Sequence, residues 1–133
     1  MAGEARILLV DDDDDLRSVI MTTLEMEGYE VEEAWNCGTA LSLLGRRSFD
    51  LVLLDITLPD DSGFRVLEYI NESRRPIPVI MTTGTSGLDN ALKSITLGAQ
   101  DYITKPYNPN YLVKAIEHAL ANNNTKQSVR SSG

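Results

Sequence analysis

Residues 51–55 read LVLLD, four apolar residues that end in an aspartate. Residues 7–12 read ILLVDD and repeat this pattern of an apolar run closed by acids. An uninterrupted apolar run of strand length is typical of a parallel sheet, because helices cover both faces of its central strands. The two stretches therefore predict two central strands whose carboxyl ends carry aspartates.

In all, five apolar runs of strand length alternate with segments in which apolar residues recur at helical spacing. The runs are Ile7–Val10, Tyr29–Ala34, Leu51–Leu54, Pro78–Met81 and Tyr102–Thr104. The clearest helical repeat covers 111–120, and the weakest covers 39–44, between two glycines. Five βα units in a row predict an α/β fold with a doubly wound, five-stranded parallel sheet. The Glu-rich YEVEEA and the mixed DYIT suit edge strands, which gives the strand order 2-1-3-4-5.

Length, charge and cysteine content limit the kinds of function and the cellular location that we expect for this chain. The chain has 133 residues, 42% of them hydrophobic, and a formal net charge of -8. An acidic chain is poorly suited to direct nucleic-acid binding and better suited to a metal cation or a basic partner. A single cysteine excludes an internal disulfide, and no signal peptide or membrane-length apolar run is seen, so a cytoplasmic location is expected.

The last segment differs in composition from the rest of the chain. Residues 122–133 read NNNTKQSVRSSG and carry no apolar periodicity. Such a polar segment is typical of a flexible tail or a truncated linker. We therefore expect one folded domain over residues 1–121 and a tail or linker over 122–133.

Acidic side chains gather where the predicted strands end. Ligands bind open parallel sheets at the carboxyl ends of the strands, near the point where strand order reverses. With the first and third strands adjacent, Asp11, Asp12 and Asp55 converge there. Three close carboxylates repel one another, which raises their pKa values and favours a hard divalent cation. Mg²⁺ accepts oxygen ligands of this kind and keeps open positions for a phosphoryl oxygen.

The ends of the fourth and fifth strands add groups that suit a phosphoryl ligand. The hydroxyl of Thr83 can donate to a phosphoryl oxygen, and Gly84 lets a backbone N–H approach. Lys105 can pair with another phosphoryl oxygen as a point charge. A carboxylate such as Asp55 can act as the nucleophile and form an aspartyl phosphate. Together these residues predict phosphoryl transfer at this edge of the sheet.

Four motifs in order make the chain resemble the response-regulator receiver domain of two-component signal transduction. They are ILLVDD, LVLLDITLPDDSG, PVIMTTG and GAQDYITKPY, and the resemblance covers about residues 5–121. It implies the flavodoxin-like (βα)5 fold, as in the chemotaxis regulators of this family. It also implies that the domain takes a phosphoryl group from a histidine kinase or phosphotransfer protein and is no enzyme beyond its own phosphorylation and dephosphorylation.

The resemblance assigns roles to individual residues. Asp55 looks like the phosphoacceptor, and Mg²⁺ would be held by Asp11, Asp12, Asp55 and the backbone carbonyl of Thr57. Thr83 would be the switch hydroxyl, and Tyr102 the switch aromatic residue that turns inward with it. Lys105 would pair with the phosphoryl group, and a cis peptide is expected at Lys105-Pro106.

The family also implies a partner surface. It would consist of the fourth helix, fifth strand and fifth helix, over about Leu88–Leu97, Tyr102–Thr104 and Pro109–Leu120. An output domain or target protein would bind there, and a phosphorylation-dependent homodimer is a further option. Neither a membrane nor direct nucleic-acid contact is expected of this domain.

Two alternatives stay open at this point. A haloacid-dehalogenase-type phosphatase would use an Asp-x-Asp pair, which Asp11 and Asp13 could mimic. That class needs acids shortly after its lysine, whereas the next acid after Lys105 is Glu117. A receiver-like binding module that works without phosphorylation is the second alternative. Among the acids that follow Asp12, one of Asp13–Asp15 is expected to cap the first helix.

Overall fold

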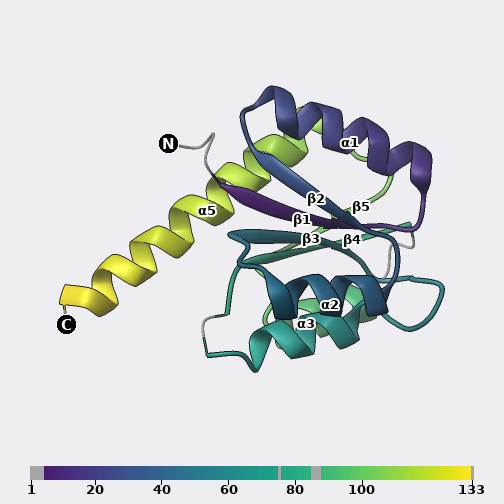
Figure 1. Ribbon diagram of the computed structural model, residues 1–133. Helices are drawn as coiled ribbons and strands as arrows, with labels where there is room; N and C mark the ends of the chain where they lie inside the picture. The colour runs from purple at the N-terminus through teal and green to yellow at the C-terminus, as the bar shows by residue number, and fades with distance from the viewer. Residues whose placement is uncertain (1–4, 75, 85–87, 133) are drawn as a thin grey trace.

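The fold is an open parallel sheet between two layers of helices, seen in a computed structural model that describes residues 5–74, 76–84 and 88–132 (Figure 1). The strands lie in the order β2-β1-β3-β4-β5, and every neighbouring pair is parallel. Their bounds are β1 Arg6–Val10, β2 Glu30–Ala34, β3 Leu51–Asp55, β4 Val79–Thr83 and β5 Asp101–Thr104. The doubly wound sheet and its predicted strand order are confirmed, with the two less apolar strands at the edges.

The helices are α1 Asp14–Met26, α2 Cys37–Arg46, α3 Phe64–Asn71, α4 Leu88–Thr96 and α5 Pro109–Ser132. Side chains of a strand alternate between faces, so each central strand feeds two cores. Leu8 and Val10 of β1 join a cluster with α2 and α3, whereas Ile7 and Leu9 join one with α1 and α5. Figure 1 shows α1 on one side of the sheet and α2 with α3 on the other.

The helix expected least strongly, over 39–44, is longer than its apolar pattern indicated. It begins after Asn36, whose side chain accepts a hydrogen bond from the Thr39 N–H at 2.8 Å, while the Thr39 hydroxyl accepts one from the Asn36 N–H at 3.3 Å. This reciprocal capping satisfies N–H groups that otherwise lack partners at a helix start. The helix therefore forms although Gly38 and Gly45 lie inside its bounds.

Two further features concern α4 and α5. The apolar stripe of α4 faces outward, with Leu88, Leu92 and Ile95 each more than half exposed and Ser94 fully buried. Helical periodicity locates a stripe but does not say what covers it. In addition, α5 spans Pro109–Ser132, and the division into a domain over 1–121 and a tail or linker over 122–133 stays a prediction. No proline interrupts residues 110–132, so nothing in the backbone chemistry ends the helix earlier.

Candidate phosphoryl-transfer site

Asp11 is the first residue beyond β1 and lies at the carboxyl edge of the sheet. Its backbone N–H donates to the carbonyl of Ala34 at 3.1 Å, and its Oδ1 accepts from the Asp13 N–H at 2.9 Å. Only 2% of Asp11 is exposed, whereas Asp12 is exposed. The end of β1 thus presents one buried and one solvent-facing acid, side by side.

Asp55 is the last residue of β3, next to β1 in the sheet, and 5% of it is exposed. Its Oδ1 accepts a hydrogen bond from the Thr57 N–H at 3.1 Å. The following loop is drawn tightly over it, because the Gly63 N–H donates to the Ile56 carbonyl at 2.6 Å. A Cβ atom at Gly63 would overlap the Asp55 carbonyl oxygen, so only glycine fits there.

The predicted convergence of the three acids is present. One carboxylate oxygen from each of Asp11, Asp12 and Asp55 lies within 4.8 Å of the others. All three donors are hard oxygen atoms, and one nearby lysine leaves an excess of negative charge. This donor set fits a hard divalent cation such as Mg²⁺ better than a soft metal, which prefers sulfur or imidazole ligands.

Lys105 reaches into this acidic cluster from the end of β5. Its Nζ donates to Oδ2 of Asp11 and to Oδ2 of Asp55, at 2.8 Å in each case. Its backbone N–H donates to the Thr83 carbonyl at 2.7 Å, which ties the end of β5 to the end of β4. The Lys105-Pro106 peptide is cis, as the resemblance implied.

Burial has the largest effect on the ionisation of Asp55. Removal from water disfavours its carboxylate and raises its pKa, against the smaller opposing effect of the Lys105 hydrogen bond. The charge of Asp11 also raises this pKa, but less than burial does, so the like-charge repulsion expected from the sequence is the minor cause. For Lys105, burial alone would lower the pKa, but the hydrogen bonds to Asp11 and Asp55 outweigh it and raise the pKa.

The remaining predicted residues lie around this cluster. Thr83 is buried at the end of β4, with 1% exposed, and Thr82 beside it is buried as well. Tyr102 is partly buried and packs against the core cluster that contains α2 and α3. Thr57 lies on the exposed loop after Asp55 and forms a β-bridge with Ser62. The structure thus puts the three acids, Thr57, Thr83 and Lys105 at the carboxyl edge of the sheet, whereas Tyr102 pairs with Met81 within it. The roles of these residues remain predictions.

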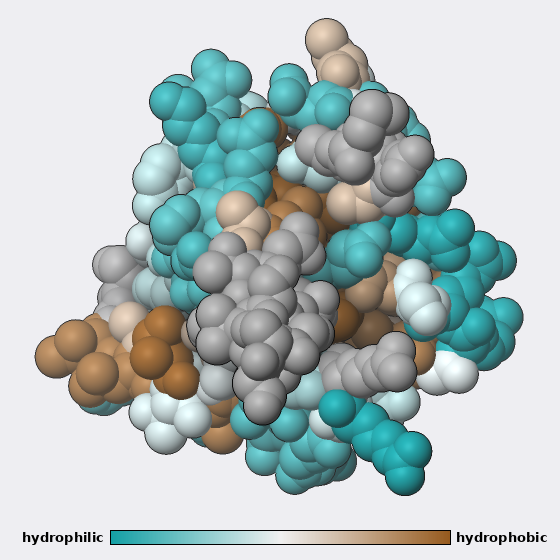
Figure 2. All heavy atoms as spheres, turned by 90° about the vertical axis from the view of Figure 1, so that its left-hand side faces the viewer, coloured by the Kyte–Doolittle hydropathy of each residue, from teal (hydrophilic) through white to brown (hydrophobic). Residues whose placement is uncertain are grey.

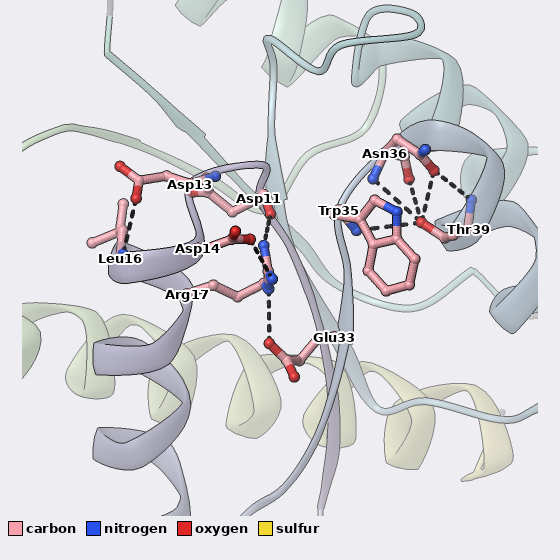
Figure 3. Close-up of polar contacts among 9 residues, drawn as sticks. All are labelled: Asp11, Asp13, Asp14, Leu16, Arg17, Glu33, Trp35, Asn36 and Thr39. Atoms are coloured by element: carbon pink, nitrogen blue, oxygen red, sulfur yellow. Dashed lines mark hydrogen bonds and ion pairs between the residues drawn. The ribbon is translucent and has the colours of Figure 1, made fainter.

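Asp13 confirms the expectation of a helix cap. Its side chain accepts a hydrogen bond from the Leu16 N–H at 3.1 Å and begins α1 (Figure 3). A residue used in this way is not the second acid of an Asp-x-Asp phosphatase pair. Glu117, the next acid after Lys105, is exposed on α5. Both observations weigh against the phosphatase alternative.

Two residues that support the site structurally were not predicted from the sequence. Arg17 donates from Nη1 to the Asp11 carbonyl at 2.7 Å. Asp60, expected to lie in a solvated loop, is exposed but accepts hydrogen bonds from the N–H groups of Cys37 and Gly38 at 2.9 and 3.0 Å. Those two N–H groups belong to the first turn of α2, where a negative charge is favourable. Both contacts end on backbone atoms, which no spacing of residue types in the sequence indicates.

Cys37 and His118 do not form a reactive pair. The Cys37 thiol is buried and donates to the Ser62 carbonyl at 3.3 Å. Burial raises the pKa of this thiol to about 11, which removes its thiolate at neutral pH. His118 instead contacts the Asn122 side chain at 3.0 Å.

Comparison with known proteins identifies the family of this chain. The family model described as "Response regulator receiver domain" matches residues 7–117. The chain belongs to this family. Receiver relatives include the phosphate regulon transcriptional regulatory protein PhoB of Pseudomonas aeruginosa, 40% identical over 122 residues, and the regulatory protein AtoC of Escherichia coli, 33% identical over 130 residues. The match covers 90% of this chain and 53% of PhoB, and 98% of this chain and 28% of AtoC. The chain therefore spans about half the length of the first relative and less of the second.

Solved receiver structures have the same fold. A CheY-like response regulator receiver domain protein from Methanospirillum hungatei is 39% identical with a TM-score of 0.88, over 92% of this chain and 98% of that one. NtrX from Brucella abortus is 33% identical with a TM-score of 0.90, over 97% of this chain and 29% of that one. Among the helices of this receiver that the structure describes, none has the length and apolar composition of a membrane span.

Proposed function

We propose that this receiver takes a phosphoryl group from the phosphohistidine of a sensor histidine kinase, or of a phosphotransfer protein, onto Asp55. The observation that carries the proposal is the environment of the Asp55 carboxylate. It is buried, lies beside Asp11 and Asp12, and is contacted by Lys105 at 2.8 Å. An acid with two acidic neighbours and a lysine within reach has the parts that phosphoryl transfer to a carboxylate requires.

In this reaction a carboxylate oxygen of Asp55 attacks phosphorus. A P–O bond forms while the P–N bond of phosphohistidine breaks, and the electron pair of that bond leaves with the imidazole. Lys105 holds one phosphoryl oxygen, and the Thr83 hydroxyl moves to donate to another. Asp11, Asp12, Asp55 and the Thr57 carbonyl would hold Mg²⁺, which supplies positive charge against the phosphoryl oxygens when bound. We assign no turnover reaction to the domain beyond formation and loss of its own aspartyl phosphate.

We further propose that phosphorylation acts on partners through the α4–β5–α5 face, made of α4, β5 and residues 109–120 of α5. Four large apolar side chains are more than half exposed on its helices: Leu88, Leu92, Ile95 and Tyr111. In Figure 2 hydrophobic atoms protrude at the lower left of the view, and others are visible between hydrophilic atoms at its centre and right. Exposed apolar side chains close together favour protein contact. In this proposal Thr83 and Tyr102 couple Asp55 to the face, which binds an output domain, a target protein or a second receiver in the cytoplasm.

Acetyl phosphate tests the acceptor directly. With Mg²⁺, we expect one hydroxylamine-labile phosphoryl group per chain, detected by intact-mass spectrometry. The label should be absent from Asp55→Ala and present in Asp11→Ala and in Asp13→Asn, which alters only the α1 cap. Labelling that survives Asp55→Ala would overturn the assignment. Release of phosphate in large excess would favour the phosphatase, and no label in the unaltered protein would favour the phosphorylation-independent module.

A second measurement tests the proposed face. Leu92→Glu should be labelled at the same rate as the unaltered protein, because α4 does not contribute a side chain to the acidic cluster. It should lose any phosphorylation-dependent self-association seen by analytical ultracentrifugation. Self-association that is unchanged by Leu92→Glu would show that the contact lies elsewhere.

A further inference from the structure

Arg17 joins three segments of the chain: the residue that follows β1, strand β2 and the first turn of α1 (Figure 3). Its Nη1 donates to the backbone carbonyl of Asp11, its Nε to Oε1 of Glu33 and its Nη2 to Oδ1 of Asp14, each at 2.7 Å. The Arg17 side chain is 11% exposed, while that of Glu33 is 38% and that of Asp14 84% exposed, so the guanidinium is shielded but its contact with Asp14 lies at the surface. Hydrogen bonds from a charged donor at this length are among the stronger ones in proteins.

The contact with Asp11 fixes more than a single atom. The Asp11 carbonyl belongs to the planar peptide that joins Asp11 to Asp12, so holding this oxygen fixes the orientation of the whole peptide. The carboxylate end of Asp11 is held separately by Lys105 and by the Asp13 N–H. Arg17 therefore controls the backbone from which the exposed Asp12 carboxylate approaches the other two acids.

A positive charge at this place would ordinarily weaken a cation site by Coulomb repulsion. Here two carboxylates contact the guanidinium, one from β2 and one from the first turn of α1. The group of Arg17, Glu33 and Asp14 carries a net charge of about −1. The repulsion is thus cancelled locally, while the geometric effect on Asp11 and Asp12 remains.

We propose that Arg17 is a positioning residue for the cation site: it holds the Asp11–Asp12 peptide in place and, with its charge neutralised by Glu33 and Asp14, strengthens Mg²⁺ binding. This inference rests on the Mg²⁺ site of the proposed function. The expected effect is opposite to simple Coulomb repulsion. Removing a positive charge beside a cation site would ordinarily strengthen cation binding, whereas we expect removal of Arg17 to weaken it.

Calorimetric titration of the unphosphorylated protein with Mg²⁺ provides the test. Arg17→Gln should weaken Mg²⁺ binding about tenfold, the usual scale for loss of a group that orients metal ligands. Arg17→Lys should weaken it by a similar factor, because lysine keeps the charge but cannot reach three acceptors with one planar group. Glu33→Gln should also weaken it, by a smaller factor, since the guanidinium charge is then less compensated.

Arg47→Gln is the matched control. Arg47 follows α2 and pairs with Glu32 at 3.4 Å, away from the carboxyl edge of the sheet, and its loss makes the same change in net charge. It should leave Mg²⁺ affinity within about twofold, since exposed ion pairs contribute little. Thermal unfolding without Mg²⁺ identifies the temperature at which every variant is folded. Should Arg17→Gln not fold, Arg17→Lys and Glu33→Gln carry the test.

Several outcomes would overturn the proposal. Tighter Mg²⁺ binding by Arg17→Gln would mean that charge repulsion dominates, and unchanged binding by Arg17→Lys would mean that only the charge matters. Affinity in Arg17→Gln equal to that of the unaltered protein would make Arg17 merely structural, while acetyl phosphate labelling of Asp55 could still succeed. Conversely, the protein could bind Mg²⁺ with the expected dependence on Arg17 but fail to be labelled by acetyl phosphate. That result would support the role of Arg17 and overturn the proposed function. No Mg²⁺ binding by the unaltered protein would overturn both.

Discussion

The ammonium nitrogen of Lys105 lies 2.8 Å from Oδ2 of Asp55, a residue 50 positions earlier in the chain. The same nitrogen lies 2.8 Å from Oδ2 of Asp11. One lysine therefore offsets two buried carboxylates at the point where we propose that a phosphoryl group is added. This arrangement makes the stability of the unphosphorylated domain sensitive to each of the three charges.

Replacement of Lys105 by methionine should destabilise the fold. It leaves Asp11 and Asp55 buried without their cationic partner, a change that commonly costs about 3 kcal/mol of unfolding free energy. Urea denaturation at pH 7 without Mg²⁺ measures this loss, and addition of Mg²⁺ should recover part of it. Lys114→Met, an exposed position on α5, is the control and should change stability little.

The contribution of Lys105 to the stability of the folded domain should decrease at high pH. The folded-state pKa of Lys105 is raised above its ordinary value of 10.5, so its contribution is fully present below pH 10.5. It is lost as pH rises through the folded-state pKa. A stability difference between the two proteins that grows above pH 10.5 would contradict this account.

Asp55→Asn should stabilise the Mg²⁺-free domain. Burial raises the folded-state pKa of Asp55 above 3.8, so folding favours its protonated form and the carboxylate costs stability at neutral pH. The variant should be more stable than the unaltered protein at pH 7. The gain should shrink as pH falls through the raised pKa and vanish below 3.8, where both states are protonated. Glu68→Gln, an exposed site on α3, controls for the change in net charge.

Asp60→Asn should weaken the contact between the β3–α3 loop and α2. Hydrogen bonds from the backbone N–H of Cys37, and next from that of Gly38, lower the pKa of Asp60 below its usual 3.8. Its contribution is therefore present above pH 3.8 and lost as pH falls through the folded-state pKa. We expect a melting temperature a few degrees lower at pH 7, about the scale of a lost helix cap, and a smaller difference at pH 3.

Asp61→Asn is the matched control for Asp60. Asp61 is its neighbour and forms an exposed ion pair with Arg65 at 3.2 Å, which should contribute little to stability. Equal melting temperatures for the Asp60 and Asp61 variants at pH 7 would show that the contact with α2 does not stabilise the domain.

Gly63→Ala should impair both folding and phosphorylation. Its Cβ would overlap the Asp55 carbonyl oxygen, so the loop or the end of β3 must shift. We expect a loss of about 3 kcal/mol in unfolding free energy and much slower labelling by acetyl phosphate. Gly45→Ala is the control, since its Cβ would meet no atom within 4 Å, and a helical Gly→Ala change should be neutral or stabilising. Unchanged labelling of Gly63→Ala would show that this loop tolerates movement.

Much of the site could be located from the sequence because it depends on topology. Asp11, Asp12 and Asp55 end neighbouring parallel strands, and parallel strands end at one edge of the sheet. Lys105 directly follows β5 at the far edge of the sheet, and its predicted place was correct because its long side chain spans the distance to the acids. Chain order and strand order were enough to bring these four residues together.

The sequence by itself determined the sheet, its strand order and the acidic cluster, since apolar periodicity and strand ends are local properties. Only the tertiary structure decided that the apolar stripe of α4 faces outward, that Arg17 holds the Asp11 carbonyl and that Asp60 binds the start of α2. The outward stripe depends on which layer packs against α4, which periodicity does not specify. The contact of Arg17 with Asp11 and the contacts of Asp60 with α2 involve backbone groups, which every residue carries, so residue types cannot indicate them. Only the packing of α1, α2 and the β3–α3 loop brings these groups within hydrogen-bonding distance.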